Sequence, residues 1–291
     1  MTPPSQARQP SLALTWRHRA ALVGFFLSGF AALIYEVCWI REASLAFGST
    51  TQALSTVLAV FFLGIAVGSA LFARWGQNAR PMIWFAALEL LLGALALATP
   101  VLFDLTEQIF GVAYRTLGDQ SQALVAVRVA LVSLILFLPT VCMGGTLPLM
   151  CRQFVVQPHR VGYTTGFLYG LNTLGAAAGT LAAGFVLIPG IGVHGSILIA
   201  ASINLLVGIA VGILGLGMPT VGFDKAPQTA KKPKDSDVGS GNVFAQAVVY
   251  CLFFLIGAVA LANEVLWTRF LSLVNRTTVH TYTLTLAVVL V

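Results

Sequence analysis

The strongest constraint in this sequence is a series of apolar runs, each long enough to cross a membrane as a helix. A bilayer core about 30 Å thick requires about 20 apolar residues in a helix. Seven runs meet this requirement, and few charged residues interrupt them. The sequence therefore predicts an all-α integral membrane protein, a multi-span helical bundle of the transporter type. The predicted spans are residues 20–40, 52–73, 82–103, 122–147, 162–188, 194–216 and 244–266.

The composition excludes a water-soluble globule. Hydrophobic residues make up 58% of the chain and charged residues 9%, whereas a soluble domain is about 25% charged. The mean hydropathy is +0.90, so the polar surface is too small to cover a soluble fold. The net charge of +6 does not indicate nucleic-acid binding, because the Lys and Arg residues lie between apolar runs and form no continuous basic stripe.

An eighth apolar run begins near Thr277 and is still apolar at Val291. Its length of about 14 residues is too short to cross a bilayer. This run predicts that the chain is a fragment of a longer protein, and a re-entrant or interfacial segment is the alternative. The first run is predicted to be a retained span, because it is longer than the apolar region of a signal peptide and no small-residue cleavage site follows it.

The positive charges predict the orientation of the chain. With the N-terminus in the cytoplasm, eleven Lys and Arg residues lie inside and five outside. The positive-inside rule therefore favours a cytoplasmic N-terminus, and the expected location is a bacterial inner membrane. Residues 1–19 are predicted to be a disordered cytoplasmic terminus. Residues 217–243 are predicted to be a flexible cytoplasmic linker, because they are polar and contain Pro, Gly and Ser without an apolar period.

An internal repeat relates residues 25–60 to residues 253–288 at a constant offset of 228. Both copies read E-V-x-W-x-R-x-x-S-L, and chance does not readily place Glu, Trp, Arg and Ser in register. The repeat unit holds six spans, so both copies enter the membrane from the same side, as in the two halves of major-facilitator transporters. The predicted domains are a six-span half at 20–216 and the first spans of a second half at 244–291. The matched polar and aromatic pairs are Glu36 and Glu264, Trp39 and Trp267, Arg41 and Arg269, and Ser44 and Ser272.

Glu36 and Glu264 are candidate site residues, because ionisable groups within a membrane usually mark a function or a partner. They predict either a cation or proton site between the two halves or structural ion pairs. The arginine of each copy lies five residues after the glutamate, about 140° around the helix. A local pair is therefore poor, and we expect crossed pairs of Glu36 with Arg269 and of Glu264 with Arg41.

Four further polar or aromatic positions stand out. Glu89 lies in the middle of the third span, where it either faces a cavity or pairs across helices. Asn172 in the fifth span is predicted to form an interhelical hydrogen bond rather than to bind a ligand. Trp39 and Trp267 are predicted to be interface anchors rather than platforms for a substrate.

Small residues at four-residue spacing predict close packing of helices. In the fourth span, Pro139 and the run 143–148 are expected to kink or break the helix. None of the common catalytic motifs is present, and the four cysteines show no metal-ligand spacing, so we predict no catalytic residue and no metal site. The packing glycines are Gly64, Gly68, Gly162, Gly166, Gly170, Gly175 and Gly179.

Several segments resemble the membrane region of the fused major-facilitator/spermidine-synthase family. They read SGFAALIYEVCWIREASLAFGSTTQALSTVLAVFFLGIAVGS, LPTVCMGGTLPLM and GFLYGLNTLGAAAGTLAAGFVLIPGIG. The resemblance covers nearly all of residues 20–291. It implies transfer of an aminopropyl group from decarboxylated S-adenosylmethionine to putrescine. In that family the chemistry belongs to a C-terminal domain, so the resemblance implies no cofactor and no catalytic residue at any position of this chain.

Three functions remain open at this point. The chain is the membrane region of a spermidine-synthase-like enzyme, a major-facilitator-like transporter of a small solute, for which an amine is one candidate, or a membrane scaffold without catalytic activity. The expected partners are the lipid bilayer, a C-terminal aminopropyltransferase domain and a second copy of the chain. A second copy is considered because a lone half would expose its interface with the other half.

Overall fold

The computed structural model of the chain describes residues 16–47, 50–75, 80–117, 121–155, 160–217, 241–274 and 283–288. Within these ranges the regular elements are helices, and no strand occurs. A short helical stretch covers residues 283–288. The longer elements are α1 (Trp16–Phe47), α2 (Thr50–Trp75), α3 (Pro81–Leu117), α4 (Ser121–Phe154), α5 (Val161–Ala182), the π-helical turn η3 (Ala183–Leu187), α6 (Ile188–Leu216) and α7 (Gly241–Val274).

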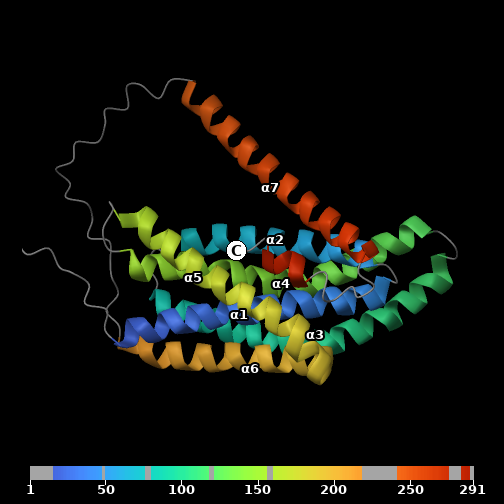
Figure 1. The fold of residues 1–291 in the computed structure, drawn as a ribbon, viewed down its shortest axis with the longest axis horizontal. Coiled ribbons are helices and arrows are strands. Elements are labelled where there is room, and N and C mark those ends of the chain that lie inside the picture. Colours follow the sequence, from blue (N-terminus) through green and yellow to red (C-terminus); the bar gives the residue numbers. More distant parts are fainter. Residues whose placement is uncertain are drawn as a thin grey trace, which may run out of the picture.

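Six continuous helical stretches of the described residues are long and apolar enough to cross a membrane. One of them, Val161–Leu216, has 56 residues and turns back at Gly192, whose φ is +74°. Figure 1 shows the result, with α5 and α6 lying antiparallel. This stretch therefore crosses twice, and the described residues supply seven crossings. The all-α, multi-span membrane bundle predicted from the apolar runs is confirmed.

The loop expected between residues 103 and 122 is mostly helical. Helix α3 continues to Leu117, and α4 begins at Ser121, so both extend beyond the rest of the bundle in Figure 1. Residues 104–117 contain no proline, and a hydropathy scan marks where a helix leaves the apolar layer rather than where it ends. The predicted disordered terminus and linker fall largely in residues 1–15 and 218–240, which lie outside the described residues.

The predicted break in the fourth span is absent. Helix α4 runs from Ser121 to Phe154 with Pro139 and Pro148 inside it. Membrane helices tolerate proline because neighbouring helices and Ser or Thr side chains satisfy the freed backbone groups. Pro139 removes the N–H that would bond the carbonyl oxygen of Ile135, and the Thr140 hydroxyl donates to the next carbonyl, that of Leu136, at 2.9 Å.

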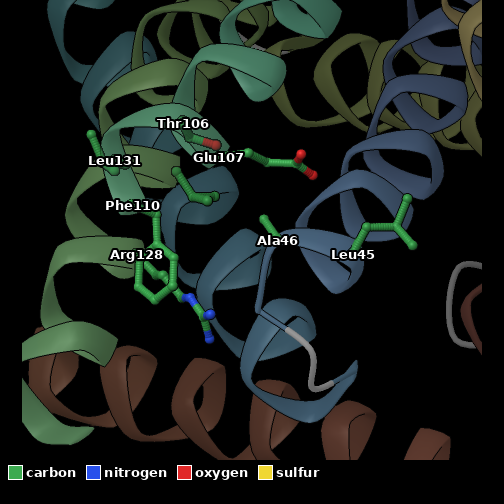
Figure 2. A pocket seen from close by; sticks show the side chains of 8 residues that line it. Leu45, Ala46, Thr106, Glu107, Phe110, Arg128 and Leu131 are labelled. Carbon is green, nitrogen blue, oxygen red and sulfur yellow. The ribbon is translucent and has the colours of Figure 1, made fainter. Parts of the chain in front are cut away.

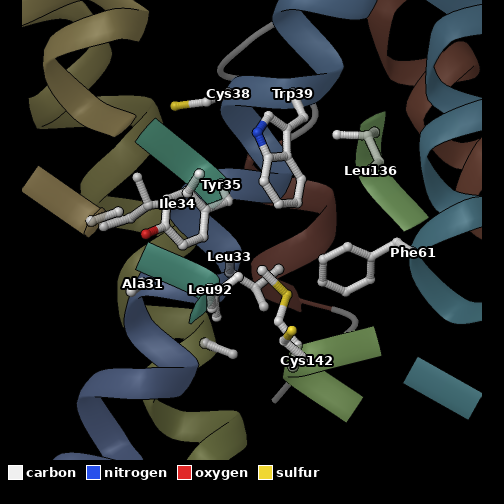
Figure 3. Close-up of a cluster of buried hydrophobic side chains, with 14 of the residues drawn as sticks. Ala31, Leu33, Ile34, Tyr35, Cys38, Trp39, Phe61, Leu92, Leu136 and Cys142 are labelled. Atoms are coloured by element: carbon white, nitrogen blue, oxygen red, sulfur yellow. The ribbon is translucent and has the colours of Figure 1, made fainter. Parts of the chain in front are cut away.

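Helix α1 is the centre of the bundle. In its most apolar stretch 67% of the residues are buried, compared with 33–44% for the helical stretches of α2 to α6 and 0% for α7. Figure 3 shows Tyr35 and Trp39 of α1 among Phe61 of α2, Leu92 of α3 and Leu136 of α4. Its role as the hub explains why the first copy of the repeat is buried.

The six helices α1 to α6 are arranged as two similar units of three. Helix α5 packs on α1 as α2 packs on α4, and α6 packs on α1 as α3 packs on α4. Helices α3 and α6 pack against each other. Exchanging α1–α3 with α4–α6 therefore reproduces the main contacts, although α1 meets α2 more extensively than α4 meets α5. Because each unit has an odd number of spans, the two units run through the membrane in opposite directions. This inverted arrangement occurs within each half of major-facilitator transporters.

Three arginines close the ends of neighbouring helices. Arg17 donates to the carbonyl oxygen of Gly217 after α6 at 2.6 Å, and Arg128 to that of Phe47 at the end of α1 at 2.8 Å. Arg152 donates to the carbonyl oxygen of Ala73 in the last turn of α2 at 3.1 Å. The last carbonyls of a helix have no intrahelical donor, and a cationic donor satisfies them and opposes the negative end of the helix dipole.

Large apolar side chains cover the outside of the bundle. Leu134 is 78% exposed, Val186 65% and Leu206 66%. A surface of this kind is unfavourable in water and suits lipid. Helix α7 diverges from the other helices over most of its length in Figure 1. The stretch 283–288 instead lies inside, where Leu286 belongs to the main apolar core. A Cβ on Gly184 of η3 would collide with the side chain of Thr283, so this glycine permits their close approach.

Candidate functional site

A carboxyl group lies at the centre of the six-helix bundle. Glu89 of α3 is fully buried, with 0% of its side chain exposed. The hydroxyl of Ser28 on α1 donates to Glu89 Oε1 at 2.6 Å, and the amide of Asn204 on α6 donates to Glu89 Oε2 at 2.5 Å. One side chain thus connects three helices, and both of its oxygens accept a hydrogen bond.

The network continues from Asn204 back to α1. The hydroxyl of Tyr35 donates to Asn204 Oδ1 at 2.8 Å, which directs the amide nitrogen of Asn204 towards Glu89. The ring of Tyr35 stacks on Trp39 with centroids 5.3 Å apart, and Trp39 Nε1 donates to the Thr99 hydroxyl at 3.1 Å. Tyr35 therefore orients Asn204 towards Glu89, while the bond of Trp39 leads to Thr99 and from there to the carbonyl oxygen of Ala96.

Glycines beside the polar residues let α3 and α6 approach each other. Gly93 follows Glu89 by one helical turn, and a Cβ on Gly93 would lie 3.2 Å from the carbonyl oxygen of Ala201. Gly208 follows Asn204 by one turn, and a Cβ there would lie 2.7 Å from Leu90. The glycines bring the two backbones close enough for the shorter side chain of Asn204 to reach Glu89.

No cation neutralises Glu89 within the described part of the chain. The ion pair found there within 4.0 Å is His194 with Glu42, at 3.9 Å and at one end of the bundle. Buried charge is costly without a partner, and the two donors are the compensation that the described residues give Glu89. The geometry suits a carboxyl group that ties three helices together.

The repeat predicts two crossed ion pairs, Glu36 with Arg269 and Glu264 with Arg41. Glu36 is buried, with 2% exposed, and Arg269 donates a hydrogen bond to Thr51 of α2. Arg41 is exposed, and Glu264 makes no ion pair with it within 4.0 Å. The expected pair of Glu264 with Arg41 is therefore wrong for this structure. In α7 the glutamate faces the bundle, while the guanidinium of Arg41 lies at the surface of α1.

Two buried oxygens of α7 have no hydrogen-bond partner among the described residues. They are Oε1 of Glu264 and Oγ1 of Thr268, and their side chains are 5% and 6% exposed. The two residues are one turn apart on the same face. Glu264 thus differs from Glu89, whose carboxyl oxygens are both satisfied.

The two tryptophans of the repeat have different environments. Trp39 is fully buried, so its predicted role as an interface anchor is wrong. Helix α1 continues to Phe47, eight residues beyond Trp39, which places Trp39 within the bundle where its N–H finds Thr99. Trp267 is 56% exposed, and a role as anchor stays a prediction for it.

The glycines divide into two groups. Added Cβ atoms at Gly64, Gly68, Gly175 and Gly179 would collide with α4 or α1, so these glycines lie at close helix contacts. Cβ atoms at Gly162, Gly166 and Gly170 would meet nothing within 4 Å. The packing expected for these three glycines is not seen, because the first half of α5 contacts the bundle through the face that carries Leu168. Asn172 lies against Gly29 of α1, and its side chain forms no hydrogen bond with the residues that the structure describes.

A pocket of about 170 Å³ lies at the end of α1 that is distant from the N-terminus. It is lined by Leu45 and Ala46 of α1, by α3 from Thr106 to Phe110, and by α4 from Arg128 to Val132. Figure 2 shows Glu107 and Arg128 on its wall, with the Arg128 guanidinium beside the ring of Phe110. The guanidinium carbon is 3.8 Å from the ring centroid. This stacking and the bond to Phe47 account for Arg128 as a structural residue.

Sequence reasoning identified Glu89 but missed its partners. Ser28, Tyr35 and Asn204 are ordinary residues in apolar runs, and choosing them requires the rotation of each helix. One signal was available, since Asn204 lies in the middle of the sixth span as Asn172 does in the fifth. No group of three or more His, Cys, Asp or Glu side chains among the described residues could hold a metal ion.

The fold and the buried carboxyl groups define the class of this protein, an integral, multi-pass, all-α membrane protein embedded in a lipid bilayer. No family model, curated protein or solved structure matches the chain.

Proposed function

We propose that the chain is the membrane region of a spermidine-synthase-like protein and that its bundle is of the carrier type, able to bind a small amine. The link to polyamines rests on the sequence segments that resemble the fused major-facilitator/spermidine-synthase family. The carrier type rests on the inverted pairing of α1–α3 with α4–α6.

The observation that carries the amine preference is the sign of the intramembrane charges. Glu89 is held by neutral donors only, and Glu264 has a buried oxygen without a donor. No Lys or Arg of the described residues pairs with either within 4.0 Å. Acidic groups within a membrane are costly and usually mark a path or site for a cation. Amines are cationic at neutral pH and would supply the missing charge.

Under this proposal the aminopropyl transfer takes place in a C-terminal aminopropyltransferase domain. Decarboxylated S-adenosylmethionine would be the co-substrate of that domain, and no residue of this chain takes a catalytic role. The membrane region would hold the catalytic domain at the membrane or handle its amine substrate or product. A second copy of the chain is the other proposed partner.

Binding and uptake of radiolabelled putrescine by the purified full chain test the proposal. Saturable binding in lipid nanodiscs is the expected result, and empty nanodiscs are the control. Uptake into proteoliposomes separates transport from binding alone. A transporter carries putrescine into the vesicles, whereas a membrane region that only holds putrescine for the catalytic domain does not. Absence of binding at millimolar putrescine would exclude both and would favour the scaffold.

The orientation is tested with single cysteines. We propose that the N-terminus and the linker lie in the cytoplasm of a bacterial cell, from the distribution of Lys and Arg. A Lys232→Cys variant without the native cysteines should react with a membrane-impermeant maleimide only after the inner membrane is opened. Reaction in intact spheroplasts would place the linker outside.

A further inference from the structure

Helix α7 touches the rest of the described chain along one narrow stripe. The stripe repeats every three or four residues, as one face of a helix does, and the other residues from 245 to 270 are exposed. Val265 of this stripe packs against the main apolar core, and α7 meets α2. The stripe consists of Leu261, Glu264, Val265, Thr268 and Leu271.

The only polar side chains in this stripe are the two with unsatisfied oxygens. Glu264 Oε1 and Thr268 Oγ1 are both buried without a partner among the described residues. Residues four apart in a helix are separated by about 6 Å along its axis, so a single small group can contact both side chains. Each side chain is more than nine-tenths buried.

The chemistry of the two oxygens specifies the missing partner. A carboxylate only accepts hydrogen bonds, and a hydroxyl can accept while it rotates. The carboxylate oxygen therefore requires a donor, the hydroxyl can accept from the same group, and a positive charge would compensate Glu264. Arg269 lies outside the stripe and donates to Thr51. A primary ammonium group has one positive charge and three N–H donors, enough for both oxygens.

We propose that Glu264 and Thr268 of α7 form a binding site for a primary ammonium group. The Glu264 carboxylate balances the charge and accepts one N–H, and the Thr268 hydroxyl accepts a second. This assignment rests on the proposed function, because it names the place where the amine binds. It adds a selectivity that charge alone does not give, since a quaternary ammonium ion has no N–H to donate.

The first copy of the repeat provides an internal comparison. The matching stripe of α1 is also buried and consists of Leu33, Glu36, Val37, Ile40 and Ala43. The position of Thr268 is occupied there by Ile40, so this register tolerates a branched apolar side chain against the bundle. The hydroxyl of α7 is thus not required for packing, and a Thr268→Val variant should fold.

Binding of radiolabelled putrescine to the full chain in nanodiscs tests the site. We expect Glu264→Gln to raise the Kd about 30-fold or more, because a buried charge loses its partner. Thr268→Val should raise the Kd about fivefold through the loss of one hydrogen bond, and Thr268→Ser should restore it. Glu107→Gln removes an exposed carboxylate outside the stripe and is the matched control with unchanged Kd. Butylamine should compete, and tetramethylammonium should not.

The outcomes separate this site from the proposed function. If the wild-type chain binds no putrescine, the proposed function fails and the site fails with it. If the wild type binds and both Glu264→Gln and Thr268→Val bind equally well, this site is wrong while the function stands. Equal competition by tetramethylammonium would overturn the recognition of N–H groups.

A measurement on the wild-type chain avoids any effect of substitution on folding. A hydrophobic carbodiimide modifies carboxyl groups in apolar surroundings, and mass spectrometry of peptides locates the product. Glu264 should be modified and butylamine should slow the reaction at least tenfold at saturation. Glu89, with both oxygens bonded, is the internal reference whose slow modification butylamine leaves unchanged. Modification of Glu264 that butylamine does not slow would contradict the proposal.

Discussion

Replacement of Glu89 by leucine and by glutamine separates the hydrogen bonds of the central network from its charge. Glutamine keeps the shape of the side chain. Its amide oxygen can accept from Asn204, and its NH₂ can donate to the Ser28 hydroxyl, which rotates to accept. Leucine offers no acceptor. Ser28 can then donate to a carbonyl one turn earlier in its own helix, whereas the Asn204 amide, held by Tyr35, keeps unsatisfied hydrogens.

The expected cost follows from this accounting. Leucine removes two hydrogen bonds to Glu89, and hydrogen bonds between membrane helices contribute about 0.6 kcal/mol each on average. A buried donor left without a partner costs about 1–3 kcal/mol. We therefore expect Glu89→Leu to lower the free energy of unfolding by about 1–3 kcal/mol, a factor of about 5 to 150 in the unfolding equilibrium. Glu89→Gln should lower it by less than about 1 kcal/mol.

The buried cysteines provide the assay. Cys38 and Cys142 are buried and Cys251 is exposed, so in a Cys251→Ala background maleimide labelling of Cys38 and Cys142 reports unfolding. Labelling is measured across a series of increasing fractions of sodium dodecyl sulfate in mixed micelles, with the partly buried Cys151 as a baseline. If glutamine destabilises the chain as much as leucine, the hydrogen-bond reasoning is wrong. A leucine variant as stable as the wild type would mean that the network adds no stability.

Three further substitutions have matched controls or clear geometry. Gly179→Ala should destabilise the bundle by about 2 kcal/mol or more through overpacking against α1, whereas Gly166→Ala should be neutral or slightly stabilising; the same labelling assay measures both. Trp39→Phe should cost about 1–3 kcal/mol through its lost bond and packing, and Trp267→Phe less than about 0.5 kcal/mol; equal costs would contradict their different burial. Arg128→Leu should cost about 1 kcal/mol, and a lysine there should recover only part of it, as thermal unfolding would show.

The spans could be predicted because the length of an apolar run is a local property. Lipid requires each crossing segment to satisfy its own backbone hydrogen bonds, so an apolar run of sufficient length predicts a helix. The same reasoning overestimated breaks. Pro139 and Pro148 lie within α4, and the segment after Phe103 stays helical. Both differences have one cause. A fall in hydropathy or a proline does not by itself end a helix when its backbone hydrogen bonds can still be satisfied.

The site could be predicted only in part, because a hydrogen bond between helices depends on their rotation and depth. Glu89 was recognisable as a charge within a span. The choice of Ser28 and Asn204 as its partners depends on how α1 and α6 face α3, and hydropathy does not record this. The glycines show the same limit, since Gly166 and Gly179 share one helix and one spacing rule and only Gly179 meets a neighbour.

The repeat shows most directly what a motif determines. Helices α1 and α7 share the E-V-x-W-x-R pattern, and both bury the stripe that contains the glutamate. In α1 the residues from 33 to 40 are buried on every side of the helix, whereas in α7 this stripe alone is turned inward. Trp39 lies off this stripe and is buried because α3 supplies Thr99, whereas Trp267, at the matching position, meets no such helix among the described residues and is 56% exposed. Both copies thus bury the glutamate, whereas burial of the tryptophan depends on the neighbouring helices. Within the stripe, the Thr268 hydroxyl is the polar feature that the first copy lacks, since Ile40 occupies the matching position.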